Sequence, residues 1–312
     1  MKVADRRPRV GILGAGALGT LFGWHVAAVA DVAYLDIQSE LCARIERDGV
    51  RLEGAEPRAV HATVEPSRLF GSEMLFVFVK AHDTLRALRP FAGRLDPSAA
   101  IVSVQNGIGN EEAIKTALGG SVAVVIGATT ESALAVGDGI TRRLGTGRTV
   151  LGSAGATAAT VERVVGLLVA AGFDARGVYD IRPHLWGKLI ANAAINPTSA
   201  LLGAPSGIIL TDPDAAALAR AIALEAAAVA RGSGVQLLFA DPWTYVREIA
   251  ERTAHVENSM ALDLGAGRRT EIDHINGAVV AAGRRLGVAT PYNETLTRMI
   301  KAAERKERVL RS

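Results

Sequence analysis

The chain has 312 residues, of which 49% are hydrophobic and 21% charged, and its formal net charge is +3. This length is sufficient for two domains with a large core. The basic residues are spread along the chain without a stripe interleaved with aromatic residues, which argues against nucleic acid as a partner. Cys42 is the only cysteine, so an intrachain disulfide is excluded and a reducing compartment is expected.

The first residues lead directly into a Gly-rich strand, with no apolar segment typical of a signal peptide before it. The apolar stretch from Leu21 to Leu35 is interrupted by His25 and Asp31, and it is too short to cross a bilayer. We therefore expect a cytoplasmic protein with no membrane partner.

The first half of the chain alternates short aliphatic runs with helical stretches, a pattern typical of a parallel sheet covered on both faces. The expected strands are residues 9–13, 32–36, 74–79, 100–104 and 122–127. A Gly-punctuated hairpin over residues 141–152 is expected to extend this sheet. A helix over residues 157–171 and a strand over residues 173–178 complete this half.

The second half carries long Ala- and Leu-rich helical stretches and no predicted strand. The expected helices are residues 185–202, 214–231, 242–264 and 272–286. The sequence thus predicts an α/β Rossmann domain over residues 1–180 and an all-helical domain over residues 181–312. The cleft between such domains is the default ligand site. The Ala-rich stretch 215–230 indicates close helix packing and favours a homodimer.

A glycine-rich segment follows the first expected strand and opens an apolar helix, as the dinucleotide-binding motif G-x-G-x-x-G requires. In this motif the first glycine permits a tight turn, the second lets the backbone approach the pyrophosphate, and the third allows close packing of helix and strand. The helix N-terminus presents free N–H groups to the phosphates. The matching residues are Gly14, Ala15, Gly16, Ala17, Leu18 and Gly19.

Asp36 ends the second expected strand, 22 residues after Gly14. An acid at this place binds the ribose hydroxyls of NAD and repels the additional phosphate of NADP. The alternative is that Asp36 caps the following helix.

Lys188, Asn192 and Asn196 are spaced four residues apart, so on a helix they form one stripe. The residues around them are apolar. Polar groups on such a helix need partners, because an unpaired buried group costs about 1–3 kcal/mol. A stripe that faces solvent is the alternative. Glu271, taken alone, is an ordinary acid in the first turn of a helix.

Several motifs of the chain resemble, in order, those of the ketopantoate reductase (2-dehydropantoate 2-reductase) family. The resemblance extends from the glycine motif to the end of the second domain. It implies that the second domain is similar to the C-terminal domain of 6-phosphogluconate dehydrogenase. The residues that carry it are Lys80, Gln105-Asn106-Gly107-Ile108-Gly109, Leu185-Trp186-x-Lys188-Leu189 with Asn192 and Asn196-Pro197, and Thr270-Glu271-Ile272-Asp273-x-Ile275-Asn276-Gly277.

The resemblance implies reduction of a 2-keto acid, ketopantoate in pantothenate biosynthesis, by a nicotinamide cofactor. It implies that Lys188 donates the proton to the carbonyl oxygen, and partial burial would lower its pKa toward neutrality. Glu271 would hold the substrate hydroxyl or orient Lys188, and would also lie at the cofactor. The remaining implied contacts are Asn192, Asn196, Ser259 and Asn106 to the substrate, and Asn106 and Lys80 to the cofactor. The six histidines show no metal-ligand spacing, so no metal is expected.

The chain departs from this family after the second strand, where an arginine commonly holds the NADP phosphate. Here the segment is Asp36-Ile37-Gln38, although Arg44 and Arg47 on the next helix could reach back. We therefore expect NAD(H), with NADP(H) as the family alternative. The departure also leaves open another branched or aromatic 2-keto acid as substrate. A redox sensor that only binds the dinucleotide is the alternative without catalysis.

Overall fold

The computed structural model describes residues 6–120, 122–137, 139–153 and 155–311, without the side chains of residues 308–311. The chain forms two compact units. The first contains the chain up to Gln105 together with Asn110–Ile181, and the second contains Asn106–Gly109 and the chain from Arg182 onward. The short segment Asn106–Gly109 thus lies between two parts of the first unit in sequence but packs with the second.

The first unit is built on an eight-stranded sheet with the order β11-β10-β7-β6-β5-β1-β2-β4. Its strands are parallel except at the β10–β7 pair, which is antiparallel. The strands are β1 (Arg9–Leu13), β2 (Asp31–Leu35), β4 (His61–Thr63), β5 (Met74–Val77), β6 (Ala100–Ser103), β7 (Ala123–Thr129), β10 (Arg148–Gly152) and β11 (Asp174–Gly177). The predicted Rossmann sheet is therefore confirmed.

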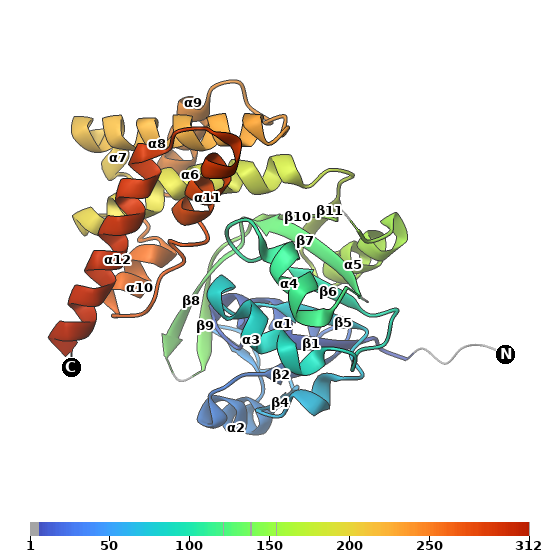
Figure 1. The fold of residues 1–312 in the computed structure, drawn as a ribbon. Coiled ribbons are helices and arrows are strands. Elements are labelled where there is room, and N and C mark those ends of the chain that lie inside the picture. Colours follow the sequence, from blue (N-terminus) through green and yellow to red (C-terminus); the bar gives the residue numbers. More distant parts are fainter. Residues whose placement is uncertain (1–5, 121, 138, 154, 312) are drawn as a thin grey trace. The chain divides into compact units, whose positions relative to one another are not determined.

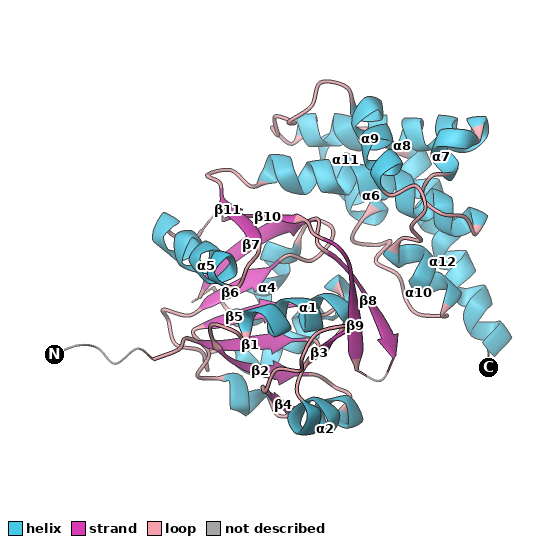
Figure 2. Cartoon of the chain, turned by 180° about the vertical axis from the view of Figure 1, so that it is seen from behind, coloured by secondary structure: helices cyan, strands magenta, loops and turns pink. Residues whose placement is uncertain are grey.

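Helices cover both faces of this sheet (Figures 1 and 2). Helices α1 and α5 lie on one face, where Phe22 of α1 stacks on Phe173 with ring centres 4.4 Å apart. Helices α3 and α4 lie on the other face, and α2 packs beside the edge strand β4. These helices are α1 (Ala17–Val26), α2 (Ser39–Asp48), α3 (Thr84–Leu88), α4 (Asn110–Leu118) and α5 (Ala158–Ala170), with short 3-10 turns at Pro66–Leu69, Ala81–Asp83 and Arg89–Phe91.

The predicted hairpin over residues 141–152 is wrong. Strand β9 (Ile140–Gly145) pairs instead with β8 (Ser132–Gly137) and β3 (Arg51–Leu52) in a separate three-stranded sheet that contacts α1. Strand β10 alone joins the main sheet, beside β7. Gly147 marks this crossover, because a Cβ there would lie 2.2 Å from the carbonyl carbon of Thr130. The glycine is thus required where two chain segments cross closely, not for a tight turn.

Helices joined by loops make up the second unit, and no strand occurs among its described residues. Helix α6 packs against α8, whose alanines at positions 219, 223, 226 and 227 are fully buried. Close packing of the Ala-rich helix therefore occurs within one chain, and the homodimer stays a prediction. The helices are α6 (Arg182–Leu202), α7 (Ile208–Thr211), α8 (Pro213–Gly232), α9 (Pro242–Arg252), α10 (Ser259–Gly265), α11 (Asn276–Leu286) and α12 (Pro291–Arg311).

Two predicted helices of this unit have other bounds. The single helix over residues 242–264 is wrong, because α9 ends at Arg252 and α10 begins at Ser259. Asn258 caps the new helix, since its Oδ1 accepts from the N–H groups of Met260 and Ala261. The helix predicted over residues 272–286 begins only at Asn276. Among the described residues, no helix is both long and apolar enough to cross a membrane.

Candidate active site

The glycine motif connects β1 to α1, as its mechanism requires. Gly14 has a φ of +95°, a conformation that L-residues with a side chain rarely adopt. A Cβ on Gly19 would lie 2.0 Å from the carbonyl oxygen of Gly14, whereas a Cβ on Gly16 would meet no atom within 4 Å. The protein itself therefore requires glycine at positions 14 and 19. The space above Gly16 fits a group that approaches the backbone from outside, as a pyrophosphate does.

Asp36 follows β2 and hydrogen-bonds to this loop. Its Oδ2 accepts from the N–H of Ala15 at 2.8 Å, and its Oδ1 accepts from the N–H of Gln38 at 3.0 Å. The N-cap position of α2 is Gln38, so Asp36 is not the helix cap. The carboxylate is thus fixed between the glycine loop and the start of α2, where it adds negative charge beside the loop.

Lys80, Arg44 and Arg47 are further residues that are expected to contact the cofactor or its phosphate. Lys80 follows β5 and directly precedes the 3-10 turn Ala81–Asp83. The residue before it, Val79, adjoins the glycine loop, since a Cβ on Gly14 would lie 3.0 Å from the N atom of Val79. Arg44 and Arg47 both lie on α2, but the Arg47 guanidinium donates to Asp48 at 2.8 Å. In this conformation Arg47 is committed to a neighbour on its own helix.

The polar stripe lies on α6, as the four-residue spacing predicts. Lys188 and Asn192 are half-buried and Asn196 is buried, while the intervening positions 189–191 and 193–195 are all buried. No hydrogen bond or ion pair joins any of these three side chains to another residue in the described part of the chain. Within the described residues, the fully buried side-chain atoms that lack a partner belong to His82 and Asn276 and not to this stripe. The polar groups of the stripe therefore remain open to solvent or to a polar ligand.

The electrostatics of Lys188 suit a proton donor. Burial lowers the pKa of Lys188 to about 8, and the nearby Glu271 carboxylate opposes this shift. Glu271 is itself buried, with 7% of its surface exposed. It lies in the turn before α11, and one of its carboxylate oxygens accepts from Asn106 Nδ2 at 3.1 Å. The second unit thus brings Lys188, Glu271 and Asn106 into one polar group.

The segment that carries Asn106 packs closely on the Glu271 turn. Gly107 has a φ of +88°, and a Cβ there would lie 2.2 Å from the carbonyl oxygen of His274. The glycine of the Asn106-Gly107 motif is therefore needed for contact with this turn. The predicted residues fall into two sets: the glycine loop, Asp36 and Lys80 belong to the first unit, and the others, including Asn106, belong to the second.

Ser259 is exposed at the first position of α10. A residue that we did not predict anchors this helix end: Asn258 Nδ2 donates to Ser199 Oγ of α6 at 2.6 Å. Ser199 lies one turn after Asn196. In the sequence, Asn258 can be predicted as an N-cap because it precedes an apolar run. Its partner on α6, Ser199, is not indicated by any local sequence pattern.

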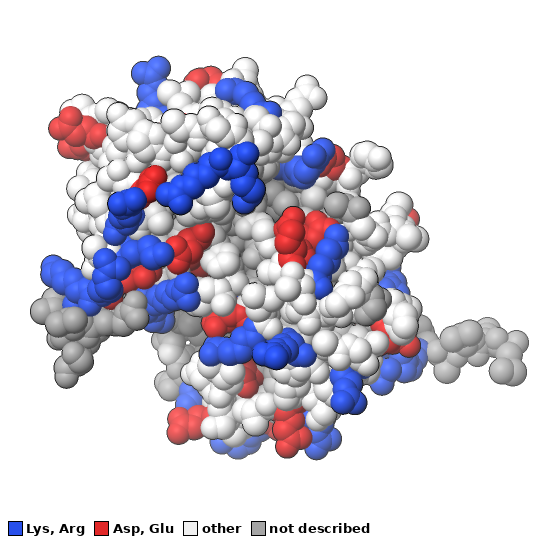
Figure 3. Space-filling view, in the orientation of Figure 1, with Lys and Arg blue, Asp and Glu red and all other residues white. Residues whose placement is uncertain are grey.

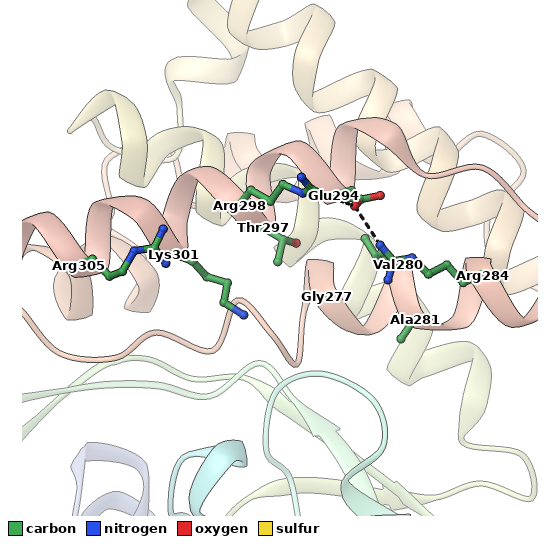
Figure 4. Close-up of a pocket in the computed structure, with 9 residues that line it drawn as sticks. All are labelled: Gly277, Val280, Ala281, Arg284, Glu294, Thr297, Arg298, Lys301 and Arg305. Atoms are coloured by element: carbon green, nitrogen blue, oxygen red, sulfur yellow. Dashed lines mark hydrogen bonds and ion pairs between the residues drawn. The ribbon is translucent and has the colours of Figure 1, made fainter.

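A separate pocket of about 400 Å³ lies between α11 and α12 (Figure 4). None of the predicted site residues lines it. Basic side chains gather over these helices with acidic ones among them (Figure 3). Glu294 accepts from Arg284 and Arg298, and Lys301 donates to Asp273 at 2.8 Å. Three cations of this pocket are thus paired with acids, Glu294 on α12 and Asp273 in the turn before α11. The pocket therefore does not offer the uncommitted polar groups that the α6 stripe does.

Comparison with known proteins identifies the family. The family described as "Ketopantoate reductase PanE/ApbA" matches residues 10–156, and "Ketopantoate reductase PanE/ApbA C terminal" matches residues 180–304. The chain belongs to the ketopantoate reductase family. These reductases are oxidoreductases, and the family membership confirms the resemblance that the motifs predicted.

Individual relatives cover nearly the whole chain. The 2-dehydropantoate 2-reductase of Archaeoglobus fulgidus is 34% identical over 96% of this chain and 99% of its own length. That of Pyrobaculum aerophilum is 37% identical, with 94% and 97% covered. Among solved structures, a PanE/ApbA family ketopantoate reductase from Ralstonia eutropha JMP134 has a TM-score of 0.88 at 31% identity, covering 96% of this chain and 99% of its own. A D-mandelate dehydrogenase solved with NADH and anilino(oxo)acetate has a TM-score of 0.87 at 25% identity, with the same coverage.

Proposed function

We propose that this protein is a 2-dehydropantoate 2-reductase that reduces ketopantoate to pantoate with a nicotinamide cofactor. The observation that carries the proposal is the stripe of Lys188, Asn192 and Asn196. Its side chains form no hydrogen bond within the described residues, and it shares its unit with the Glu271–Asn106 pair. The names of the full-length relatives point to the same substrate.

When bound, NAD(P)H supplies the hydride that is added to the carbonyl carbon of the 2-keto acid. Lys188 donates a proton to the carbonyl oxygen, so that the product is the 2-hydroxy acid. A pKa of about 8 keeps Lys188 mostly protonated near neutral pH and makes the proton easier to release than from an ordinary lysine. The ammonium group also stabilises the negative charge that develops on the oxygen. Solvent then returns the proton to Lys188.

The other residues of the second unit bind and orient the substrate. Asn192, Asn196 and Ser259 supply amide and hydroxyl groups for its carboxylate and its hydroxyl. Asn106 holds one oxygen of Glu271, so that the carboxylate can orient Lys188 or accept from the substrate hydroxyl. In this proposal Asn106 and Glu271 also contact the nicotinamide end of the cofactor.

The first unit binds the dinucleotide through the glycine loop, with Lys80 near the same loop. We propose NAD(H) as the preferred cofactor, because the Asp36 carboxylate lies against the N–H of Ala15 and would repel a ribose phosphate. The NADH complex of the structurally similar D-mandelate dehydrogenase supports this preference. NADP(H) is the alternative.

A second candidate function is that of a D-2-hydroxyacid dehydrogenase for an aromatic 2-keto acid. It is favoured by the TM-score of 0.87 to D-mandelate dehydrogenase. The two candidates share their chemistry and differ in the acid that the pocket accepts.

A steady-state assay of NADH and NADPH oxidation with ketopantoate and with phenylglyoxylate tests these proposals. We expect kcat/KM for ketopantoate to exceed that for phenylglyoxylate at least about tenfold, a difference of about 1.4 kcal/mol in transition-state binding. We expect a similar preference for NADH over NADPH. A higher kcat/KM for phenylglyoxylate than for ketopantoate would support the second candidate function. If neither acid were turned over, the protein would be a dinucleotide-binding redox sensor and not a reductase of these acids.

A further inference from the structure

Helix α6 contains a proline in its interior, directly after the polar stripe. Pro197 has no N–H, so the carbonyl oxygen of Ala193, four residues earlier, lacks its usual helical donor. Both residues are buried, and Ala193 has no exposed surface. A buried carbonyl in this situation requires a donor from elsewhere in the protein.

Asn276 supplies that donor. Its Nδ2 donates to the Ala193 carbonyl oxygen at 3.0 Å and to Asn293 Oδ1 at 3.0 Å. Asn293 in turn donates to Glu225 of α8 at 2.8 Å. Asn276 is fully buried, and its own Oδ1 has no hydrogen-bond partner within the described residues. A buried polar atom without a partner is uncommon, and here the two bonds that Nδ2 donates account for the orientation of the Asn276 amide.

The hydrogen bond from Asn276 to the Ala193 carbonyl joins the α6 stripe to the turn that carries Glu271. Ala193 lies between Asn192 and Asn196 on α6, and Asn276 follows Glu271 by five residues. The intervening turn is closed by backbone bonds, because the Glu271 carbonyl accepts from Ile275 N at 3.0 Å and the Ile272 carbonyl accepts from Gly277 N at 2.9 Å. A shift of Asn276 relative to Ala193 would therefore displace Glu271 relative to the stripe.

We propose that Asn276 is a positioning residue: by donating to the carbonyl that Pro197 leaves without a helical donor, it fixes the Lys188 helix against the Glu271 turn. This inference rests on the proposed function for its catalytic consequence. The structural part of the inference, that the Ala193 carbonyl needs the Asn276 donor because of Pro197, holds whatever reaction the protein catalyses.

The test is a double-mutant cycle of Asn276→Ala and Pro197→Ala. Alanine at position 197 restores an N–H that can donate to the Ala193 carbonyl, so the Asn276 donor becomes dispensable. We expect Asn276→Ala alone to lower kcat at least about 30-fold, an energy of about 2 kcal/mol. In the Pro197→Ala background the same change is expected to lower kcat less than about threefold.

Thr198→Val is the matched control. It removes a buried hydrogen bond from Thr198 Oγ1 to the Ala194 carbonyl, and this bond lies within α6 and does not join α6 to another element. Its kcat should stay within about twofold.

A second readout separates this inference from the proposed function. The pKa of Lys188, measured by NMR of 13C-labelled lysine, should change by at least about half a unit in Asn276→Ala and return in the double variant, because Glu271 shifts and is then restored. If the wild type were inactive on 2-keto acids, the proposed function would be overturned, but the pKa of Lys188 would still test the role of Asn276.

If the Asn276→Ala variant does not fold by itself, the role of Asn276 is tested by comparing Pro197→Ala with the double variant. Equal kcat values and equal pKa values of Lys188 in that pair support the inference, and so does recovery across the full cycle. Equal losses of kcat in both backgrounds, or no change in the pKa of Lys188 in Asn276→Ala, would overturn it.

Discussion

The glycine loop of the first unit and the α6 stripe of the second differ in the atoms that they offer to a ligand. In the loop, the packing of the protein itself requires glycine at positions 14 and 19 and leaves the space above Gly16 open, so the loop offers backbone atoms. In the stripe, Lys188, Asn192 and Asn196 are side chains held on a largely buried helix without hydrogen-bond partners among the described residues. The first arrangement suits binding of a constant group such as a pyrophosphate. The second suits chemistry on a particular substrate.

The largest expected effect comes from Lys188→Ala. Loss of the proton donor and of its charge should lower kcat about 1,000-fold, within the range typical of general acids. Binding of NADH, measured by fluorescence, should change less than about twofold, because the glycine loop lies in the other unit. Lys188→Arg is the control, since it retains the charge but is a much weaker acid, and it should remain far below the wild type. Full activity of Lys188→Ala would remove the distinction between binding in one unit and chemistry in the other.

The next effect compares two glycines of one loop. Gly16→Ala meets no protein atom and should leave the melting temperature within about 2 °C, while it weakens NADH binding at least about tenfold because the Cβ enters the space of the pyrophosphate. Gly19→Ala places a Cβ 2.0 Å from the Gly14 carbonyl oxygen and should destabilise the fold by about 2 kcal/mol or more. Thermal unfolding and isothermal titration calorimetry distinguish the two outcomes. Equal loss of stability in both variants would mean that Gly16 serves the fold and not the ligand.

A smaller effect is expected at Asp36. Asp36→Ser removes the negative charge beside the loop and should reduce the ratio of kcat/KM for NADH to that for NADPH about tenfold. The ratio is an internal control, because loss of the hydrogen bond to Ala15 weakens binding of both cofactors alike. An unchanged ratio would show that Asp36 supports the loop without selecting the cofactor.

The sequence predicts these two regions to different depths. The glycine loop could be predicted because it is a short motif between a strand and a helix. Within this motif Gly19 approaches the carbonyl oxygen of Gly14, and Gly16 leaves room for a ligand. The stripe could be predicted from the helical period, since Lys188, Asn192 and Asn196 recur every four residues. Family resemblance was needed to connect it with Glu271, 83 residues after Lys188.

Other features depend on contacts that no local pattern contains. The Gly-punctuated stretch over residues 141–152 has the sequence pattern of a hairpin, but the close approach of Gly147 to Thr130 marks a crossover there instead. The split between α9 and α10 depends on Asn258, which both caps α10 and bonds to Ser199. Pro197 shows in the sequence that a carbonyl lacks a donor, but only the fold identifies Asn276 as the donor.

The pH dependence of kcat/KM for reduction of the 2-keto acid tests the central claim most directly. Lys188 must be protonated to donate, and its pKa is about 8. We therefore expect kcat/KM to be highest below this pH and to fall about tenfold for each unit of pH above it, and we expect this decrease to be absent in Lys188→Ala. A profile that stays level to about pH 10, near the ordinary pKa of lysine, or that rises through pH 8, would contradict it.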